Sequence, residues 1–365
     1  DMDGYEAVFN PPQDLIVRPS IYADHVSYWR KGEDDSSAAS FVVIAAQAGN
    51  LTYFCRAEDG RLGPLGRQLD NAPLGHTVSA VLILIIVILG VGFALCNMKL
   101  ARIDLRSAVK CSRFILCCDL IAWIFLRGSL VRLFSDAELT ANYLIRTLAL
   151  SLRAGIFYIA FEPVIRRYWP NSLVTWMRIQ SGRFRDPLVG RDLITGCLLA
   201  IALFAIAPTF WNGRADDELS ANRVMIGPAI GTALSTQAYV INTSLGATAL
   251  LVLFRILSRS TLAAAAIYVL VMSFFIGPDD PSIVRWLAMV GFWTCVAFSY
   301  VRFGLVTTIV AMSVFLELSR TPLTTNLADW YSASTMLVVG SLCVVAGYGY
   351  YCSTIAPLLA SRRVG

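Results

Sequence analysis

Nine apolar segments follow one another along most of this chain, and most have the length of about 20 residues that an α-helix needs to cross a membrane. The chain is 56% hydrophobic and only 15% charged, whereas soluble domains are about 25% charged. The sequence therefore predicts an all-α integral membrane protein, a polytopic bundle of about nine transmembrane helices. The predicted spans lie near residues 76–97, 109–133, 143–165, 192–210, 231–256, 261–277, 282–301, 303–318 and 333–356.

Positive charges are distributed unevenly among the connections between these segments. The second connection, 134–142, contains no Lys or Arg, and the other even-numbered connections contain few. Since positively charged connections stay in the cytoplasm, we expect the odd connections and the C-terminus to be cytoplasmic and residues 1–74 to be outside. The positive side chains of the odd connections and the tail are Lys99, Arg102, Arg106, Lys110, Arg166, Arg167, Arg178, Arg183, Arg185, Arg191, Arg255, Arg259, Arg302, Arg362 and Arg363.

Residues 1–74 differ in character from residues 75–365, which form the predicted membrane domain. Short β-prone runs at Leu15–Val17, Phe41–Ala45 and Leu51–Phe54 are separated by turn-forming residues. They predict a small extracytoplasmic segment of β or irregular structure, for which about 70 residues supply only a marginal core. The first residue is Asp1 and not Met, so we expect a fragment or a processed product. No signal peptide is visible before residue 70.

Ionisable side chains inside apolar spans are the leading functional candidates, because a charge in hydrocarbon is costly. Asp119 and Arg153 lie near the middle of the second and third spans, and antiparallel packing of these helices would bring them to similar depth. The pair is interpreted either as a relay or ligand site or as a structural ion pair. Other candidates inside the spans are Arg127, Glu162 and Glu317.

The third connection is the longest of those predicted to be cytoplasmic. Its stretch Leu173–Ile179 suits a short helix in the membrane interface. Beyond it, Arg183, Arg185 and Arg191 flank two aspartates near the predicted membrane surface. Guanidinium groups bind phosphates and carboxylates through paired hydrogen bonds, so these arginines predict contact with anionic lipid or a protein partner. Orientation of the chain and a salt bridge within the connection explain them equally well.

No catalytic, cofactor or metal motif is present. The sequence contains no G-x-G-x-x-G, G-x-x-x-x-G-K-[ST], H-E-x-x-H or G-x-S-x-G pattern. Its nine cysteines form no C-x-x-C pair, and it has only two histidines. The sequence thus predicts no enzyme activity, no cofactor and no metal. The net charge of +5 is explained by membrane orientation and anionic lipid, so no nucleic-acid partner is expected.

Three runs are distinctive: Phe157–Pro170 (FYIAFEPVIRRYWP), Gly182–Asp192 (GRFRDPLVGRD) and Pro322–Tyr331 (PLTTNLADWY). Together they make residues 75–357 similar to the C-terminal multi-span membrane region of a group of bacterial serine/threonine protein kinases, best represented in Acidobacteria. The kinase domain of that group has no counterpart in this chain. The resemblance implies a bacterial inner-membrane location with the N-terminal segment outside. It also implies either part of a kinase or a kinase-less relative that acts as a membrane subunit in signalling.

Three functional hypotheses follow. The first is a non-catalytic membrane module that anchors, senses or scaffolds, with protein partners in the membrane. The second is a small-molecule or ion transporter that uses Asp119, Arg153 and Glu317. The third is an accessory subunit of a larger respiratory or photosynthetic membrane complex.

Overall fold

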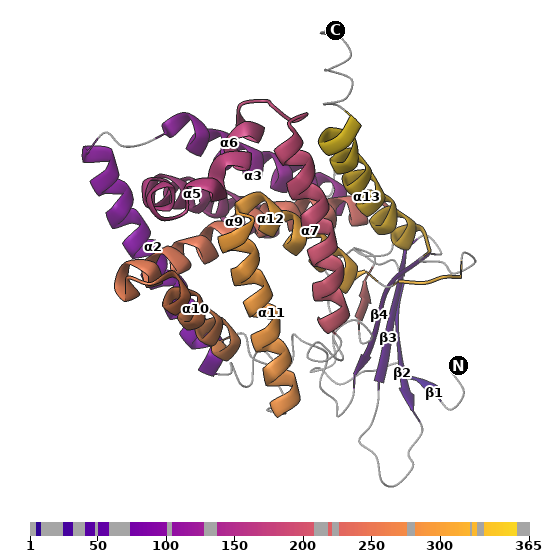
Figure 1. Ribbon diagram of the computed structural model, residues 1–365. Coiled ribbons are helices and arrows are strands. Elements are labelled where there is room, and N and C mark those ends of the chain that lie inside the picture. The colour runs from indigo at the N-terminus through magenta and orange to yellow at the C-terminus, as the bar shows by residue number, and fades with distance from the viewer. Residues whose placement is uncertain are drawn as a thin grey trace.

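The structure, a computed structural model, combines a bundle of helices with a small antiparallel sheet (Figure 1). It describes residues 5–8, 25–31, 41–47, 50–57, 74–100, 104–127, 137–207, 218–220, 226–275, 282–321, 323–326 and 332–355.

Each of the nine predicted apolar segments contains one long helix. The helices are α2 (Leu74–Lys99), α3 (Leu105–Arg127), α5 (Ala137–Tyr168), α7 (Pro187–Ile206), α9 (Ile226–Ser258), α10 (Thr261–Phe275), α11 (Ile283–Arg302), α12 (Leu305–Arg320) and α13 (Ser332–Tyr350). A π-helical turn, η4 (Tyr351–Ile355), continues α13. The connection after α5 contains the 3₁₀ turn η2 (Pro170–Leu173) and the short helix α6 (Val174–Gln180), as expected for Leu173–Ile179.

Five helices are long and apolar enough to cross a membrane, within the ranges that the structure describes. They are α5 (residues 140–168), α7, α9 (residues 229–258), α11, and α13 together with η4. Shorter apolar helices lie at 84–99 and 261–274. Helix α3 has 23 residues but carries several charged side chains. Helix α12 has only 16 residues, fewer than the ~20 that a span needs. The architecture fits an all-α membrane protein, and the number of spans stays a prediction.

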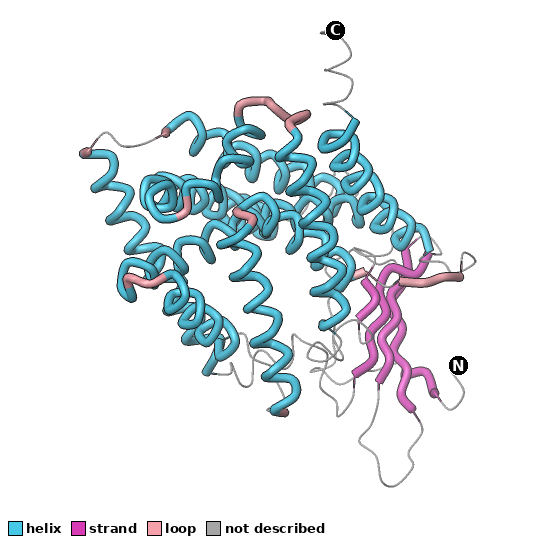
Figure 2. Tube along the Cα trace, viewed as in Figure 1, coloured by secondary structure: helices cyan, strands magenta, loops and turns pink. Residues whose placement is uncertain are grey.

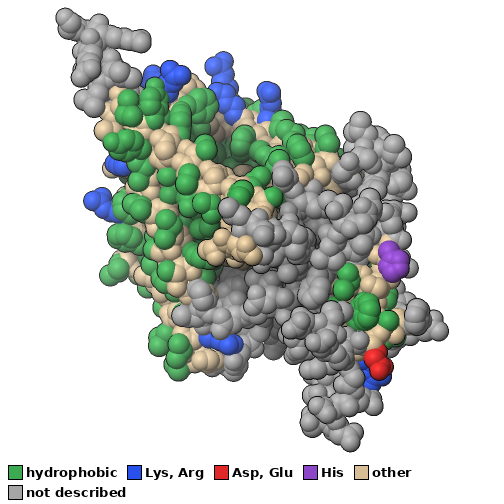
Figure 3. All heavy atoms as spheres, turned by 90° about the vertical axis from the view of Figure 1, so that its right-hand side faces the viewer, with side chains coloured by type: hydrophobic (Ala, Val, Ile, Leu, Met, Phe, Trp, Pro, Cys, Tyr) green, Lys and Arg blue, Asp and Glu red, His purple; other side chains and the backbone are tan. Residues whose placement is uncertain are grey.

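The outer face of the bundle is apolar. Figure 3 shows hydrophobic side chains spread over the helical face, with Lys and Arg side chains at its margins. Leu262, Phe274 and Val344 are 82%, 75% and 71% exposed, which is unfavourable in water and favourable against lipid. This apolar surface agrees with a membrane location.

Helices α9 and α12 supply much of the core. Helix α9 packs against α3, α5, α10 and α12, whereas α12 packs mainly against α7 and much less against α11. Consequently, α11 and α12 do not form the tightly packed hairpin that their short connection allowed. The connection turns at Gly304, whose φ of 102° and ψ of −172° are accessible essentially only to glycine.

The sheet is antiparallel and has the order β1 (Tyr5–Val8), β2 (His25–Lys31), β3 (Phe41–Gln47), β4 (Asn50–Ala57) and β5 (Glu218–Ser220). In Figure 2 its strands lie to one side of the helices. Strands β3 and β4 confirm two of the predicted β-prone runs, whereas the third, Leu15–Val17, lies outside the described residues. Strand β5 comes from the connection after α7, and Tyr53 of β4 pairs with Ser220.

Candidate functional site

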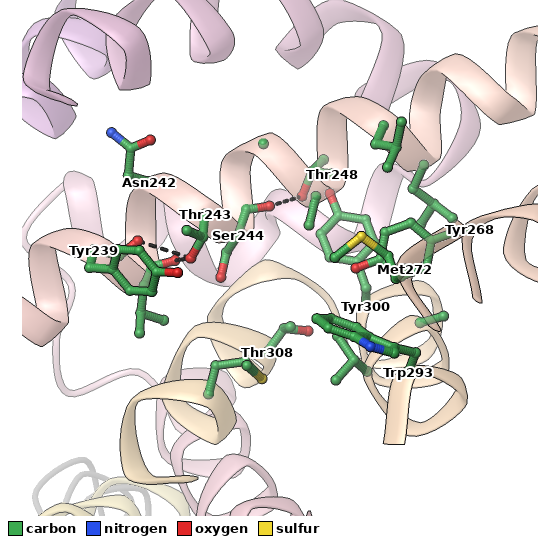
Figure 4. Close-up of a pocket in the computed structure, with 18 of the residues that line it drawn as sticks. Tyr239, Asn242, Thr243, Ser244, Thr248, Tyr268, Met272, Trp293, Tyr300 and Thr308 are labelled. Atoms are coloured by element: carbon green, nitrogen blue, oxygen red, sulfur yellow. Dashed lines mark hydrogen bonds between the residues drawn. The ribbon is translucent and has the colours of Figure 1, made fainter. Parts of the chain in front are cut away.

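A cavity of about 370 Å³ lies between six helices. Its walls come from α2, α5, α9, α10, α11 and α12, and most of the residues that line it are apolar. This volume is at the lower end of the ~300–1,000 Å³ that is typical of small-molecule pockets. The lining contains an aromatic group at one end and a polar group at the other, as Figure 4 shows.

The aromatic end is formed by Tyr268 of α10, with Trp293 and Tyr300 of α11. The rings of Tyr268 and Trp293 meet edge to face, with centroids 6.3 Å apart and an interplanar angle of 82°. Neither the Tyr268 hydroxyl nor the Trp293 indole N–H has a hydrogen-bond partner among the described residues, although both are buried. Buried donors without partners are costly, so these two groups mark the aromatic end as unusual within the described core.

The polar end is formed where α5 and α9 meet. The Arg153 Nε donates a hydrogen bond of 2.6 Å to the Asn242 Oδ1, and the Asn242 amide nitrogen donates to the backbone carbonyl of Leu150. Asn242 is fully buried, so this amide fixes the position of the guanidinium. The four Nη hydrogens of Arg153 have no hydrogen-bond or ion-pair partner among the residues that the structure describes.

A second arginine reaches the same cavity from α12. The guanidinium carbon of Arg320 lies 5.9 Å from the ring centroid of Tyr239, and Tyr239 is also an electrostatic neighbour of Arg153. Both arginines line the cavity together with Tyr239. Tyr239 is 41% exposed whereas Tyr268 is 2% exposed, so the polar end is the more accessible one.

The predicted pair of Asp119 and Arg153 does not form. The Thr147 hydroxyl donates to an Asp119 carboxylate oxygen at 3.5 Å, whereas Arg153 contacts Asn242. Helices α3 and α5 pack in a register that places Asp119 opposite Thr147, and Arg153 lies six residues further along α5. At 1.5 Å per residue, this separates the two positions by about 9 Å along the helix.

The other candidates inside the spans are distributed over separate places. Buried Glu162 forms an ion pair with Arg166, one turn later on α5. The Oε1 atom of Glu317 is buried without a hydrogen-bond partner among the described residues. The same carboxylate interacts with the Thr236 side chain and with the positive charge of Arg320. The side chain of Arg127, at the end of α3, lies outside the described residues.

The arginines of the third connection divide into two kinds. Arg191 forms a 2.9 Å ion pair with its neighbour Asp192, so it matches the expected salt bridge within the connection. Arg183 and Arg185 are exposed on either side of Phe184, and neither makes an ion pair with a described residue. The Tyr348 hydroxyl of α13 donates to the Phe184 carbonyl at 3.2 Å, which holds this turn against the end of α13.

No protein family, curated protein or solved structure matches this chain. The resemblance to kinase membrane regions therefore remains a prediction. No group of three or more His, Cys, Asp or Glu side chains is placed to hold a metal within the part of the chain that the structure describes.

Sequence reasoning identified Arg153 but not the cavity around it. Arg153 stands out because it interrupts an apolar run, whereas Tyr268, Trp293 and Tyr300 are common residue types in membrane segments. Arg320 was not singled out, because it lies at the end of an apolar segment. No signal in the single sequence indicates that these side chains, which come from different helices, surround one space.

Proposed function

We propose that this chain is a non-catalytic membrane protein that binds an elongated, mainly apolar molecule between its helices and acts as a sensor. One observation carries the proposal: a cavity of about 370 Å³ has apolar walls, an aromatic end with unpartnered donors, and a fixed arginine at its other end. Among anchoring, sensing and scaffolding, only sensing needs such a space. The apolar outer face supports uptake of the ligand from the bilayer.

Retention of a ligand in polymer nanodiscs tests this function without detergent, which would compete for the cavity. The experiment compares small molecules extracted from wild-type protein with those from Ala247→Leu, because Ala247 lines the cavity on α9. Ala202→Leu is the matched control, since Ala202 is exposed on α7. We expect an amphipathic molecule with the wild-type and control proteins and its loss from Ala247→Leu. Equal retention by all three proteins would count against the cavity as the site.

A transporter is the second candidate, and the same geometry supports it. Arg153 lines the cavity. Glu317 carries a buried oxygen without a hydrogen-bond partner among the described residues, although it lies outside the cavity lining. Asp119 lies in a different contact, against Thr147, and is therefore removed from this mechanism. Flux of a retained ligand in proteoliposomes distinguishes the candidates, because a carrier moves the ligand across the bilayer and a sensor only binds it.

The membrane orientation belongs to the same proposal. In Figure 1, α6 lies at the top of the bundle and the strands lie at its lower right. The pairing of β4 with β5 places residues 218–220 beside residues 50–57, so two segments assigned independently to the outside share one sheet. An inner-membrane location with the N-terminal segment outside and the C-terminus inside accounts for this arrangement. The accessory-subunit hypothesis remains a prediction.

A further inference from the structure

We infer that the ligand is a single-chain amphiphile with an anionic head group, and that Arg153 and Arg320 bind this head group. The inference rests on the proposed function, because it identifies the class of molecule that the cavity takes. It is carried by the position of the two guanidinium groups at the accessible end of the cavity and by its apolar remainder.

The charge balance at this end favours an anion. Arg153 makes no ion pair with any described carboxylate, and its Nε is already committed to Asn242. Arg320 lies over the Tyr239 ring. The carboxylate of Glu317 interacts electrostatically with Arg320, but Glu317 does not line the cavity. An anionic head group would accept hydrogen bonds from the Nη groups of Arg153 and offset its positive charge.

The position of Arg153 within its helix strengthens the argument. Arg153 lies midway along the 140–168 span, too far from either end for its side chain to reach the membrane surface easily. A charge at such a depth costs a few kcal/mol on insertion scales. The fully buried Asn242 holds the guanidinium toward the cavity instead of neutralising it. The remaining N–H groups of this guanidinium can therefore donate charge-assisted hydrogen bonds to an anion.

The shape of the cavity limits the rest of the ligand. On α9 the lining runs from Tyr239 to Leu251, which corresponds to about 18 Å of helix at 1.5 Å per residue. Polar side chains lie at the Tyr239 end and aromatic rings at the other, as Figure 4 shows. A space of this length and about 370 Å³ fits one acyl or isoprenoid chain and is too small for a two-chain phospholipid. The Ser244 hydroxyl also lines the cavity near the polar end.

Competition between molecules that differ only in the head group tests the inference. The full chain in neutral-lipid nanodiscs is titrated with laurate, dodecyl phosphate and dodecanol, and binding is followed by displacement of a fluorescent fatty acid. We expect laurate or dodecyl phosphate to bind about tenfold or more tightly than dodecanol, as a charge-assisted hydrogen bond implies. Whichever anion binds more tightly identifies the head group as carboxylate or phosphate.

Arginine variants show whether Arg153 and Arg320 bind the charged head group. Arg153→Gln should reduce laurate affinity about tenfold while dodecanol affinity stays unchanged, and Arg320→Gln should act in the same direction. Arg106→Gln is the control, because Arg106 is exposed on α3 and does not line the cavity. Loss of both ligands from Arg153→Gln would overturn the inference, since it would mean that Arg153 only maintains the shape of the cavity.

The titration separates this inference from the proposed function. If wild-type protein binds laurate, dodecyl phosphate and dodecanol equally, the head-group inference fails and the ligand-binding function stands. If none of the three displaces the probe, or if the probe itself does not bind, both fail. The comparison within wild-type protein requires no variant, so it does not depend on whether the substituted chains fold.

Discussion

Gly304 is the residue whose identity is most strictly constrained by its backbone. Its φ and ψ lie in a region that other residues enter at a cost of about 1–3 kcal/mol. A Cβ at this position would also lie 2.6 Å from the Ser172 carbonyl oxygen. We expect Gly304→Ala to lower the free energy of unfolding by about 1–3 kcal/mol. Thermal unfolding in mild detergent measures this change. Gly340→Ala, inside α13 where a Cβ meets nothing within 4 Å, should be neutral or slightly stabilising, because alanine is the better helix former.

Asp186 combines a helix cap with an ion pair. Its side chain accepts from the Leu188 N–H at 3.0 Å, at the start of α7, and pairs with Arg178. Burial raises the pKa of Asp186, but the hydrogen bonds from Arg178 and Leu188 and the positive charges of Arg178 and Arg183 outweigh it, so the pKa is lowered. We expect Asp186→Ala to cost about 1 kcal/mol for the cap, whereas Asp186→Asn keeps a cap and loses only the ion pair.

The pH dependence of that difference follows from the sign of the shift. Because the folded-state pKa is below the unfolded value of about 3.9, the stabilising contribution is complete above that value. It disappears as the pH falls through the lowered folded-state pKa. Thermal unfolding of wild type and Asp186→Asn should therefore differ by a constant amount above about pH 5 and converge in more acidic buffer. A gap that widens on acidification would contradict this assignment.

The sequence identified which residues are unusual more successfully than it identified their partners. Arg153 was correctly singled out as a charge in an apolar run, but its partner is Asn242 and not Asp119. The choice depends on how α3 and α5 slide along each other, and both helices present polar side chains that satisfy more than one register. A contact across 89 residues of sequence leaves no local signal in either segment.

At the scale of helices, the contact between α7 and α13 depends on a close approach of two backbones. A Cβ on Gly190 of α7 would lie 2.4 Å from the Gly349 carbonyl oxygen and 2.6 Å from the Ser353 nitrogen. Small residues allow this kind of packing where lipid supplies no hydrophobic drive between helices. We expect Gly190→Ala to force the helices apart and to cost about 1–3 kcal/mol, again measured by thermal unfolding.

Gly347→Ala is the control for this contact. Gly347 lies on α13, and a Cβ there meets nothing within 4 Å. If both substitutions destabilise the protein equally, the effect does not come from the close approach of α7 and α13. A selective loss with Gly190→Ala identifies the crossing itself.

Element positions were predicted well because apolar length is a local property. Every predicted segment contains a helix, with bounds that differ by a few residues. The role of each helix was harder to predict from the sequence. Helix α12 has the composition of a span, but it is short and largely buried. The strands β1 and β2 were missed. In β2 the available signal was the alternation of Val26 and Tyr28 with His25 and Ser27.

The whole molecule has a predicted sidedness that reporter fusions can measure. Chains truncated after Gly182 or after Ser220 are fused to a fluorescent protein that matures in the cytoplasm, or to alkaline phosphatase, which is active outside it. The odd connections are positively charged, so the insertion bias should give fluorescence at Gly182 and phosphatase activity at Ser220. The reverse pattern would invert the orientation, and identical readouts at both positions would remove α7 from the set of spans.

The pairing of β4 with β5 has a consequence for how the chain is made. Tyr53 and Ser220 are neighbours in the sheet, yet three long helices, α2, α3 and α5, and then α7 are synthesised between them. An early chain would therefore carry β4 with one open edge, which is a template for unwanted pairing with another molecule. The β4–β5 ladder can form only after the connection that follows α7 has been synthesised and lies beside β4. Overexpressed chains that stall before residue 218 should accordingly aggregate through the unpaired edge of β4.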